Sequence, residues 1–190
     1  IVQKRWLQKK SQAREQVASL LDECPEPPSA LQEHMPSGAD AFAAYPFRAG
    51  DLHHVREAMQ SLLTRDRMTA TDYIQGRALL VLVRSLFVRE NWVDRPLGAL
   101  VPWSDIFTVL QSETNLIPTW AEELLSRLQL VTADADAPIM EVAQTIFLLN
   151  RVGHVPATEE IITYLLLTDH AQDLASLLPD VQDALTLLQE

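Results

Sequence analysis

The residues best suited to a metal or acid–base site are two adjacent histidines, His53 and His54, near the start of a predicted helix. Adjacent residues on a helix point about 100° apart, so these two imidazoles cannot converge on one ion. His53 and Glu57 are four residues apart and could share one helix face and one ligand. Because pairs with this spacing are also common on solvated helix surfaces, we interpret the segment as an exposed helix face rather than a metal site.

A thiol nucleophile is the second candidate, since Cys24 precedes His34 in a polar stretch. The neighbouring carboxylates of Asp22 and Glu23 would raise the pKa of the thiol rather than lower it, so we predict an inert cysteine. A single cysteine also excludes an intramolecular disulfide and cannot hold a structural zinc ion by itself. It indicates a reducing compartment, the cytoplasm.

Neither nucleotide binding nor carboxylate catalysis has a motif in this sequence. Its five glycines form neither GxxxxGK[ST] nor GxGxxG, so both phosphate-binding loops are excluded. Three acidic pairs occur, and none is embedded in apolar sequence: Glu122 with Glu123, Glu159 with Glu160, and Asp134 with Asp136. The two glutamate pairs are explained as acids in the first turn of a helix. We therefore assign no catalytic, cofactor-binding or metal-binding residue, and leave open whether a parent protein is an enzyme.

The formal net charge of −11 is unevenly distributed along the chain. The first 14 residues carry five cationic side chains and no acid, whereas residues 130–190 carry ten acids against Arg151 alone. Neutralising phosphates needs cationic side chains, so any contact with DNA is predicted to run through the N-terminal cluster of Lys4, Arg5, Lys9, Lys10 and Arg14. We prefer the alternative, in which this cluster pairs with an acidic protein surface.

Arg77 and Arg84 are a second basic feature. They are seven residues apart on a predicted helix and share a face. Such a face could contact a phosphate or the acids of a neighbouring subunit. A solvated face or ion pairs within the chain are the interpretation that we favour.

The composition predicts an all-α fold. Glycine is scarce and β-branched runs are almost absent, whereas leucine, alanine, glutamine and glutamate are abundant. Hydrophobic residues make up 47% of the chain and charged residues 22%, which is typical of a soluble globular protein. No run of about 18 apolar residues is present, so we expect no membrane partner.

The first predicted unit, residues 1–131, is a helical bundle with a Pro-containing connection at 25–50. Helices are predicted over about 2–21, from residue 51, and over 69–89, 104–110 and 118–129, with Asp51 and Ser104 as caps and Pro118 in a first turn. Helix 69–89 carries apolar residues around most of its circumference, so we expect it to be central. Its predicted buried residues are Ile74, Leu79, Leu82, Val83 and Leu86.

The second predicted unit, residues 138–190, follows a solvated connection at 132–137. One helix runs from Pro138 to Asn150 and is closed by Gly153, a second is capped by Thr158, and a third is opened by Pro179. These proportions are winged-helix-like. The third helix begins with Asp180 and Asp183, and no Lys or Arg lies in 152–190, so it is not expected to read duplex DNA.

Several strings together resemble the region after the nucleotide-binding core in the large P-loop ATPases of BREX phage-exclusion systems (BrxC/PglY-like). The strings are YPFRAGDL at 45–52, TDYIQGRAL at 71–79, PLGALVPW at 96–103, TIFLLN at 145–150, PATEEI at 156–161 and VQDALTLL at 181–188. In that family, a string like the first begins the helical lid behind the AAA+ core, and an Arg-Ala-Leu-like string lies on a lid helix. A winged-helix-like unit follows. The resemblance covers about residues 42–190.

The resemblance implies a lid-like bundle followed by a winged-helix-like unit, within a machine that contacts protein. DNA is a second conceivable partner, and the charge distribution allows that contact only through the basic N-terminal end. The opening residues look as if they lie inside a helix, so we expect a segment of a longer protein. ATP and Mg²⁺ are implied for the parent ATPase only, since no Walker motif is present here. Arg77, in the lid-like string, is the only conceivable sensor-type position, and we do not assign that role. The alternative is a free-standing helical adaptor that binds another protein and has no connection to an ATPase.

Overall fold

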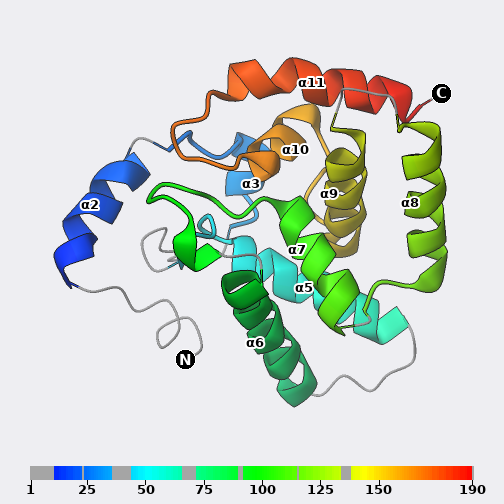
Figure 1. Cartoon of the computed structure of the whole chain (residues 1–190), viewed down its shortest axis with the longest axis horizontal. Coiled ribbons are helices and arrows are strands. Elements are labelled where there is room, and N and C mark those ends of the chain that lie inside the picture. Colours follow the sequence, from blue (N-terminus) through cyan, green and yellow to red (C-terminus); the bar gives the residue numbers. More distant parts are fainter. Residues whose placement is uncertain are drawn as a thin grey trace.

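The computed structural model describes residues 11–22, 24–35, 44–65, 72–89, 92–114, 116–133 and 138–189, and within them the fold is all-α (Figure 1). The α-helices are α2 (Ser11–Asp22), α3 (Ser29–Gln32), α5 (Asp51–Arg65), α6 (Asp72–Arg89), α7 (Trp103–Val109), α8 (Thr119–Val131), α9 (Ile139–Val152), α10 (Glu159–Leu166) and α11 (Leu174–Leu187). A 3-10 helix spans Trp92–Asp94, and a π-helical turn over Leu110–Thr114 extends α7. The described residues form no β-strand, and the closest approach to one is an isolated bridge between Ala99 and Asp169.

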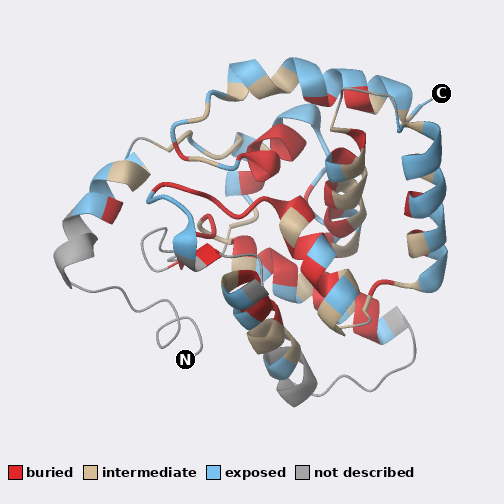
Figure 2. Cartoon of the chain, in the orientation of Figure 1, coloured by how far each residue is buried: buried red, intermediate tan, exposed pale blue. Residues whose placement is uncertain are grey.

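Helix α9 is the centre of the fold, because it packs against α5, α7, α8, α10 and α11. Its buried residues recur at helical spacing and include Val142, Leu148 and Leu149. The helix ends at Gly153, whose φ of 83° places it in the left-handed region, as the sequence predicts. Figure 2 shows the buried residues gathered on α5, α7, α9 and α10, whereas α8 and α11 are exposed over much of their surface.

The prediction that helix 69–89 is central is wrong in part. Leu82, Val83 and Leu86 of α6 are buried as predicted, but Leu79 is only half-buried and Val88 is 65% exposed. The side chain of Ile74 lies outside the described residues. Figure 1 shows α6 extending from the lower edge of the helical assembly. An apolar circumference predicts burial but not position, and α9 occupies the centre because its apolar face meets five other helices.

Two predicted helix starts are also corrected. Helix α7 begins at Trp103, after Pro102, so Ser104 lies buried in the first turn and does not cap the helix. Helix α11 begins at Leu174 because the Asp173 carboxylate accepts a hydrogen bond from the Ala175 amide at 3.0 Å. Pro179, predicted to open this helix, therefore lies inside it.

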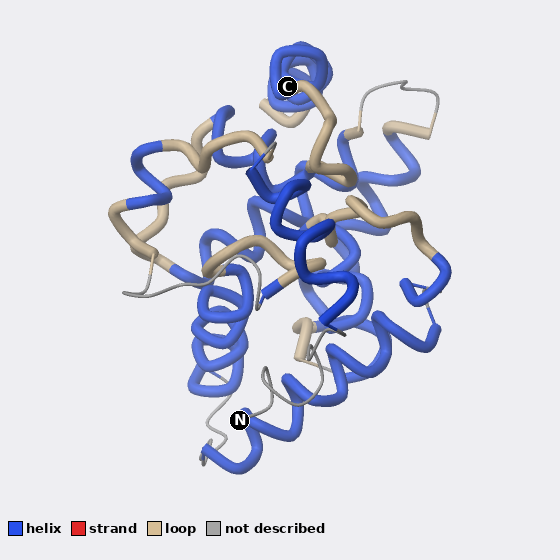
Figure 3. The backbone as a smooth tube through the Cα atoms, turned by 90° about the vertical axis from the view of Figure 1, so that its left-hand side faces the viewer, coloured by secondary structure: helices blue, strands red, loops and turns tan. Residues whose placement is uncertain are grey.

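Other local signals are confirmed. Helix α5 begins at Asp51, and the Thr158 hydroxyl accepts a hydrogen bond from the Ile161 amide at 3.3 Å at the start of α10. Pro118, predicted in a first turn, is the residue that directly precedes α8. One hydrophobic core includes residues from both predicted units, and the division at 132–137 stays a prediction. None of the described helices has the length and apolar character needed to cross a bilayer. The tube in Figure 3 shows the loops that connect the helices. The segments before α5 and α7 and those after α9 and α10 contribute residues to the sites described next.

Candidate functional site

A buried arginine joins three segments that lie far apart in the sequence. Arg48 is 4% exposed, and its guanidinium donates one hydrogen bond to the Val101 carbonyl at 2.9 Å and another to the Leu167 carbonyl. It also forms an ion pair with Asp51 at 3.4 Å. The guanidinium therefore ties the segment before α5 to the segment before α7 and to the residue that follows α10.

Asp51 completes this centre. Its carboxylate accepts hydrogen bonds from the Arg48 amide at 3.0 Å and from the Trp103 indole at 3.1 Å. Burial raises the pKa of Asp51, whereas the Arg48 guanidinium, the Trp103 indole and the Arg48 amide oppose that rise. The sequence correctly places Asp51 at the start of a helix, but the carboxylate bonds to Arg48 and Trp103. Sequence reasoning did not identify Arg48 as part of any site.

The ring of Tyr164 borders the same guanidinium. The Arg48 Cζ lies 5.4 Å from the centre of the Tyr164 ring, close enough for a cation–π contact. Burial raises the pKa of Tyr164 to about 12, with a smaller opposing effect from Arg48. The phenol therefore stays neutral, and the fold favours it in that form.

This pKa predicts a loss of stability at alkaline pH. A group whose pKa is raised by folding contributes stability that is complete below its unfolded pKa of about 10 and is lost as the pH rises through its folded pKa. Between pH 10 and 12 Tyr164 ionises in the unfolded chain but stays protonated in the folded one. The free energy of unfolding should therefore fall by roughly 2–3 kcal/mol over this range. Urea unfolding at several pH values measures this change. The free energy of unfolding should decline less steeply with pH in Tyr164→Phe than in the wild type. Identical pH profiles for the two proteins would contradict the shift.

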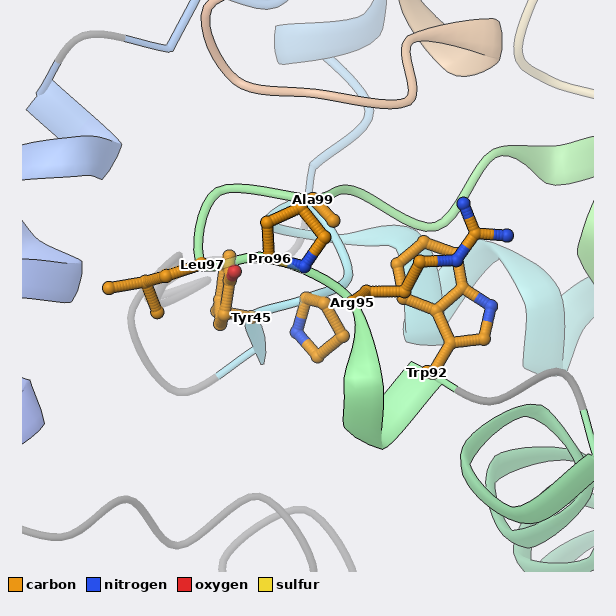
Figure 4. Close-up of a pocket in the computed structure, with 7 residues that line it drawn as sticks. Tyr45, Trp92, Arg95, Pro96, Leu97 and Ala99 are labelled. Atoms are coloured by element: carbon orange, nitrogen blue, oxygen red, sulfur yellow. The ribbon is translucent and has the colours of Figure 1, made fainter.

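A cavity of about 260 Å³ lies between the segment before α5 and residues 92–99 (Figure 4). Its lining residues are Tyr45, Pro46, Trp92, Arg95, Pro96, Leu97 and Ala99. The Arg95 Cζ lies 5.2 Å from the centre of the Trp92 ring, and the Tyr45 hydroxyl accepts a hydrogen bond from the Gly98 amide at 2.6 Å. None of the seven lining residues is a carboxylate, imidazole or thiol, so they supply no nucleophile paired with a base.

A cluster of histidines surrounds Glu57. The distances to its carboxylate are 3.3 Å from His54 Nδ1, 3.4 Å from His53 Nε2 and 3.6 Å from His154 Nε2. A fourth histidine, His34, lies with its ring centre 4.9 Å from that of His154. Three of the five histidines in the sequence therefore contact one carboxylate, and a fourth lies beside one of these three.

The structure corrects the interpretation of this segment as a purely exposed helix face. His53 is exposed, and its predicted approach to Glu57 is confirmed, but His54 is only 2% exposed. Burial lowers the pKa of His54, and hydrogen bonding to Glu57 opposes this change. His154 was missed because it lies about 100 residues from Glu57 along the chain, and no local pattern connects them.

The other candidates from the sequence are dispersed. Lys4, Arg5, Lys9 and Lys10 lie outside the described residues, and Arg14 lies on α2 with its side chain outside them. Arg77 and Arg84 are exposed on α6. Cys24 is half-buried, and burial raises the pKa of its thiol; Arg48 opposes this rise and Asp169 adds to it. A raised thiol pKa agrees with the predicted inert cysteine. Its causes are burial and Asp169, whereas the sequence alone points to Asp22 and Glu23.

Helix α8 carries a row of exposed apolar side chains that sequence reasoning did not identify. Trp120 is 56% exposed and Val131 is 85% exposed, and Leu124 and Leu130 are also largely exposed. Positions 120, 124 and 131 follow one face of the helix, with 130 beside its end. We call these four side chains the α8 apolar row.

The α8 apolar row is anchored to the fold at one end. The Trp120 ring centre lies 6.0 Å from that of Phe147 and 5.6 Å from the Arg151 Cζ, and both partners belong to the central helix α9. The row therefore starts on a fixed surface and continues along α8 away from this contact.

Comparison with protein-family models, curated proteins and solved structures finds no match for this chain.

Proposed function

We propose that this chain is a non-catalytic helical segment of a large P-loop ATPase of phage defence, made of lid-like helices and a winged-helix-like unit, and that it acts by contacting protein. The α8 apolar row is the observation that carries this proposal. Single exposed apolar side chains are ordinary on protein surfaces. Several on one helix, including a tryptophan, are typical of a protein interface.

The occupant that we propose for the α8 apolar row is the nucleotide-binding core of the same ATPase. Glu123 lies one turn from Trp120 on α8, beside the row, and residues 130–190 carry ten acids against Arg151 alone. An apolar partner surface bordered by Lys and Arg side chains complements this charge. An apolar surface of that kind would cover Trp120 and Leu124 while cations at its border meet the acids.

The packing of the resembling strings supports the lid-like part of the proposal. The strings at 45–52 and 96–103 meet where Arg48 contacts the Val101 carbonyl and Asp51 contacts Trp103. The string at 156–161 includes Thr158, the N-cap of α10, and that helix ends beside the Leu167 carbonyl that Arg48 binds. Three of the resembling strings therefore contribute to one buried centre around Arg48. Residues in such a centre depend on one another for packing, so we expect a related fold to retain the three strings together.

The winged-helix-like part rests on the succession of α9, α10 and α11. The described residues contain no β-hairpin that would serve as a wing. Asp180 and Asp183 are exposed on α11, and phosphates would repel them. We therefore propose that α11 contacts protein, and DNA contact stays a prediction for the N-terminal cluster alone.

The α8 apolar row is tested by truncating its first two side chains. Trp120→Ala with Leu124→Ala should weaken binding to the purified ATPase core encoded upstream in the parent reading frame by at least about tenfold, because truncating a tryptophan at an interface hot spot costs about 2 kcal/mol or more. Isothermal titration calorimetry measures the affinity. Ser126→Ala with Gln129→Ala, also exposed on α8, is the matched control and should bind like the wild type.

The parent reading frame separates this proposal from the alternative. A Walker A motif upstream of Ile1 supports the ATPase assignment. A start codon immediately before Ile1, with no ATPase partner, rejects it and favours a free-standing helical adaptor. If the ATPase core binds both double variants equally well, the α8 apolar row is not the contact surface.

A further inference from the structure

We propose that His54, Glu57 and His154 form a binding site for a divalent transition-metal ion of the Zn²⁺ class. Each residue offers one ligand atom, and these atoms all lie within 4.8 Å of one another. The site is independent of the α8 apolar row and of the proposed ATPase connection. It joins α5 to the loop that follows α9.

The donor set and its spacing suit zinc. Two imidazole nitrogens and one carboxylate oxygen are ligands that Zn²⁺ commonly takes, with one position left for water or a further ligand. Bonds of about 2.0–2.2 Å in a tetrahedron place neighbouring donor atoms roughly 3.3–3.6 Å apart. The distances from Glu57 Oε2 to His54 Nδ1 and to His154 Nε2 are 3.3 and 3.6 Å, which already match this spacing.

The backbone holds these ligands in place. His54 and Glu57 are three residues apart on α5, so they lie on one face one turn apart. The His54 ring is 2% exposed, so packing around it fixes its orientation. His154 directly follows Gly153, whose left-handed conformation ends α9 and sets the direction of the loop.

The surroundings provide an entry route and further imidazoles. The side chains of His154 and Glu57 are 40% and 33% exposed, so an ion can reach the site from solvent. His34 lies edge-on beside His154, and His53 contacts the second carboxylate oxygen of Glu57.

The test uses the full 190-residue chain, free of any histidine tag. Calorimetric titration with Zn²⁺ should show one ion bound per chain, and Co²⁺ should give the visible absorption of a low-coordinate site. His154→Ala and Glu57→Gln should each weaken Zn²⁺ binding at least about tenfold, because each removes a ligand. Glu160→Gln, at an exposed position, is the matched control and should leave the affinity unchanged.

Two results would overturn the site. One is the absence of a one-to-one Zn²⁺ complex with the wild-type chain, and the other is unchanged affinity in His154→Ala. That variant replaces a partly exposed loop side chain, so the test does not depend on the folding of variants at the buried His54. Circular dichroism of each variant verifies the fold. The Trp120 and Leu124 double variant should bind Zn²⁺ normally, which separates a failure here from a failure of the proposed function.

Discussion

Replacing Arg48 with methionine should destabilise the protein by about 3–5 kcal/mol, because the change leaves the buried Asp51 carboxylate without its cation. The carbonyls of Val101 and Leu167 also lose their guanidinium donors. Chemical denaturation measures the free energy of unfolding, and the unfolding midpoint should fall accordingly. Methionine retains much of the length of the side chain, so the loss reports mainly on charge and hydrogen bonds.

A second substitution separates the two contributions. Adding Asp51→Leu to Arg48→Met removes the unpaired carboxylate and should recover part of the lost stability, since replacing a whole buried ion pair costs less than breaking one. Arg84→Met, at an exposed position on α6, should change stability by less than about 0.5 kcal/mol. An equally small effect for Arg48→Met would mean that the buried centre does not stabilise the fold.

Leu82→Ala should lower the free energy of unfolding by about 2–5 kcal/mol. Leu82 is fully buried on the part of α6 that packs against its neighbours, so removing the side chain loses apolar contacts and leaves a cavity. Thermal and chemical unfolding measure the loss. Val88→Ala is the matched control on the same helix, and at 65% exposure it should be nearly neutral. An unchanged melting temperature for Leu82→Ala would place this face of α6 on the surface.

The features predicted correctly depend on signals within a few residues. Thr158 caps α10 through the amide three residues later, and Gly153 ends α9 by adopting a left-handed conformation. Pro118 precedes α8 at a position where its missing amide costs nothing. Such effects are encoded locally, so one sequence suffices to find them.

The features that sequence reasoning missed depend on competition between signals or on distance. Pro179 and Asp173 both mark helix starts, and the aspartate prevails because its side chain satisfies an amide that would otherwise lack a partner. Nothing in the residues around Arg48 indicates that it is buried, because its partner Leu167 lies 119 residues away along the chain. His154 meets Glu57 only after α9 has packed on α5. No spacing rule connects such partners.

The position of Arg48 has a consequence for the order in which the chain folds. Its carbonyl partners lie 53 and 119 residues away, so the hydrogen bonds close long loops, and each closure costs chain entropy before it yields a contact. A guanidinium that is buried before both carbonyls arrive would lack its partners, which is costly. We therefore expect Arg48 to lose its hydration late, once segments from both halves of the chain have docked. One side chain thereby makes their assembly a single cooperative event.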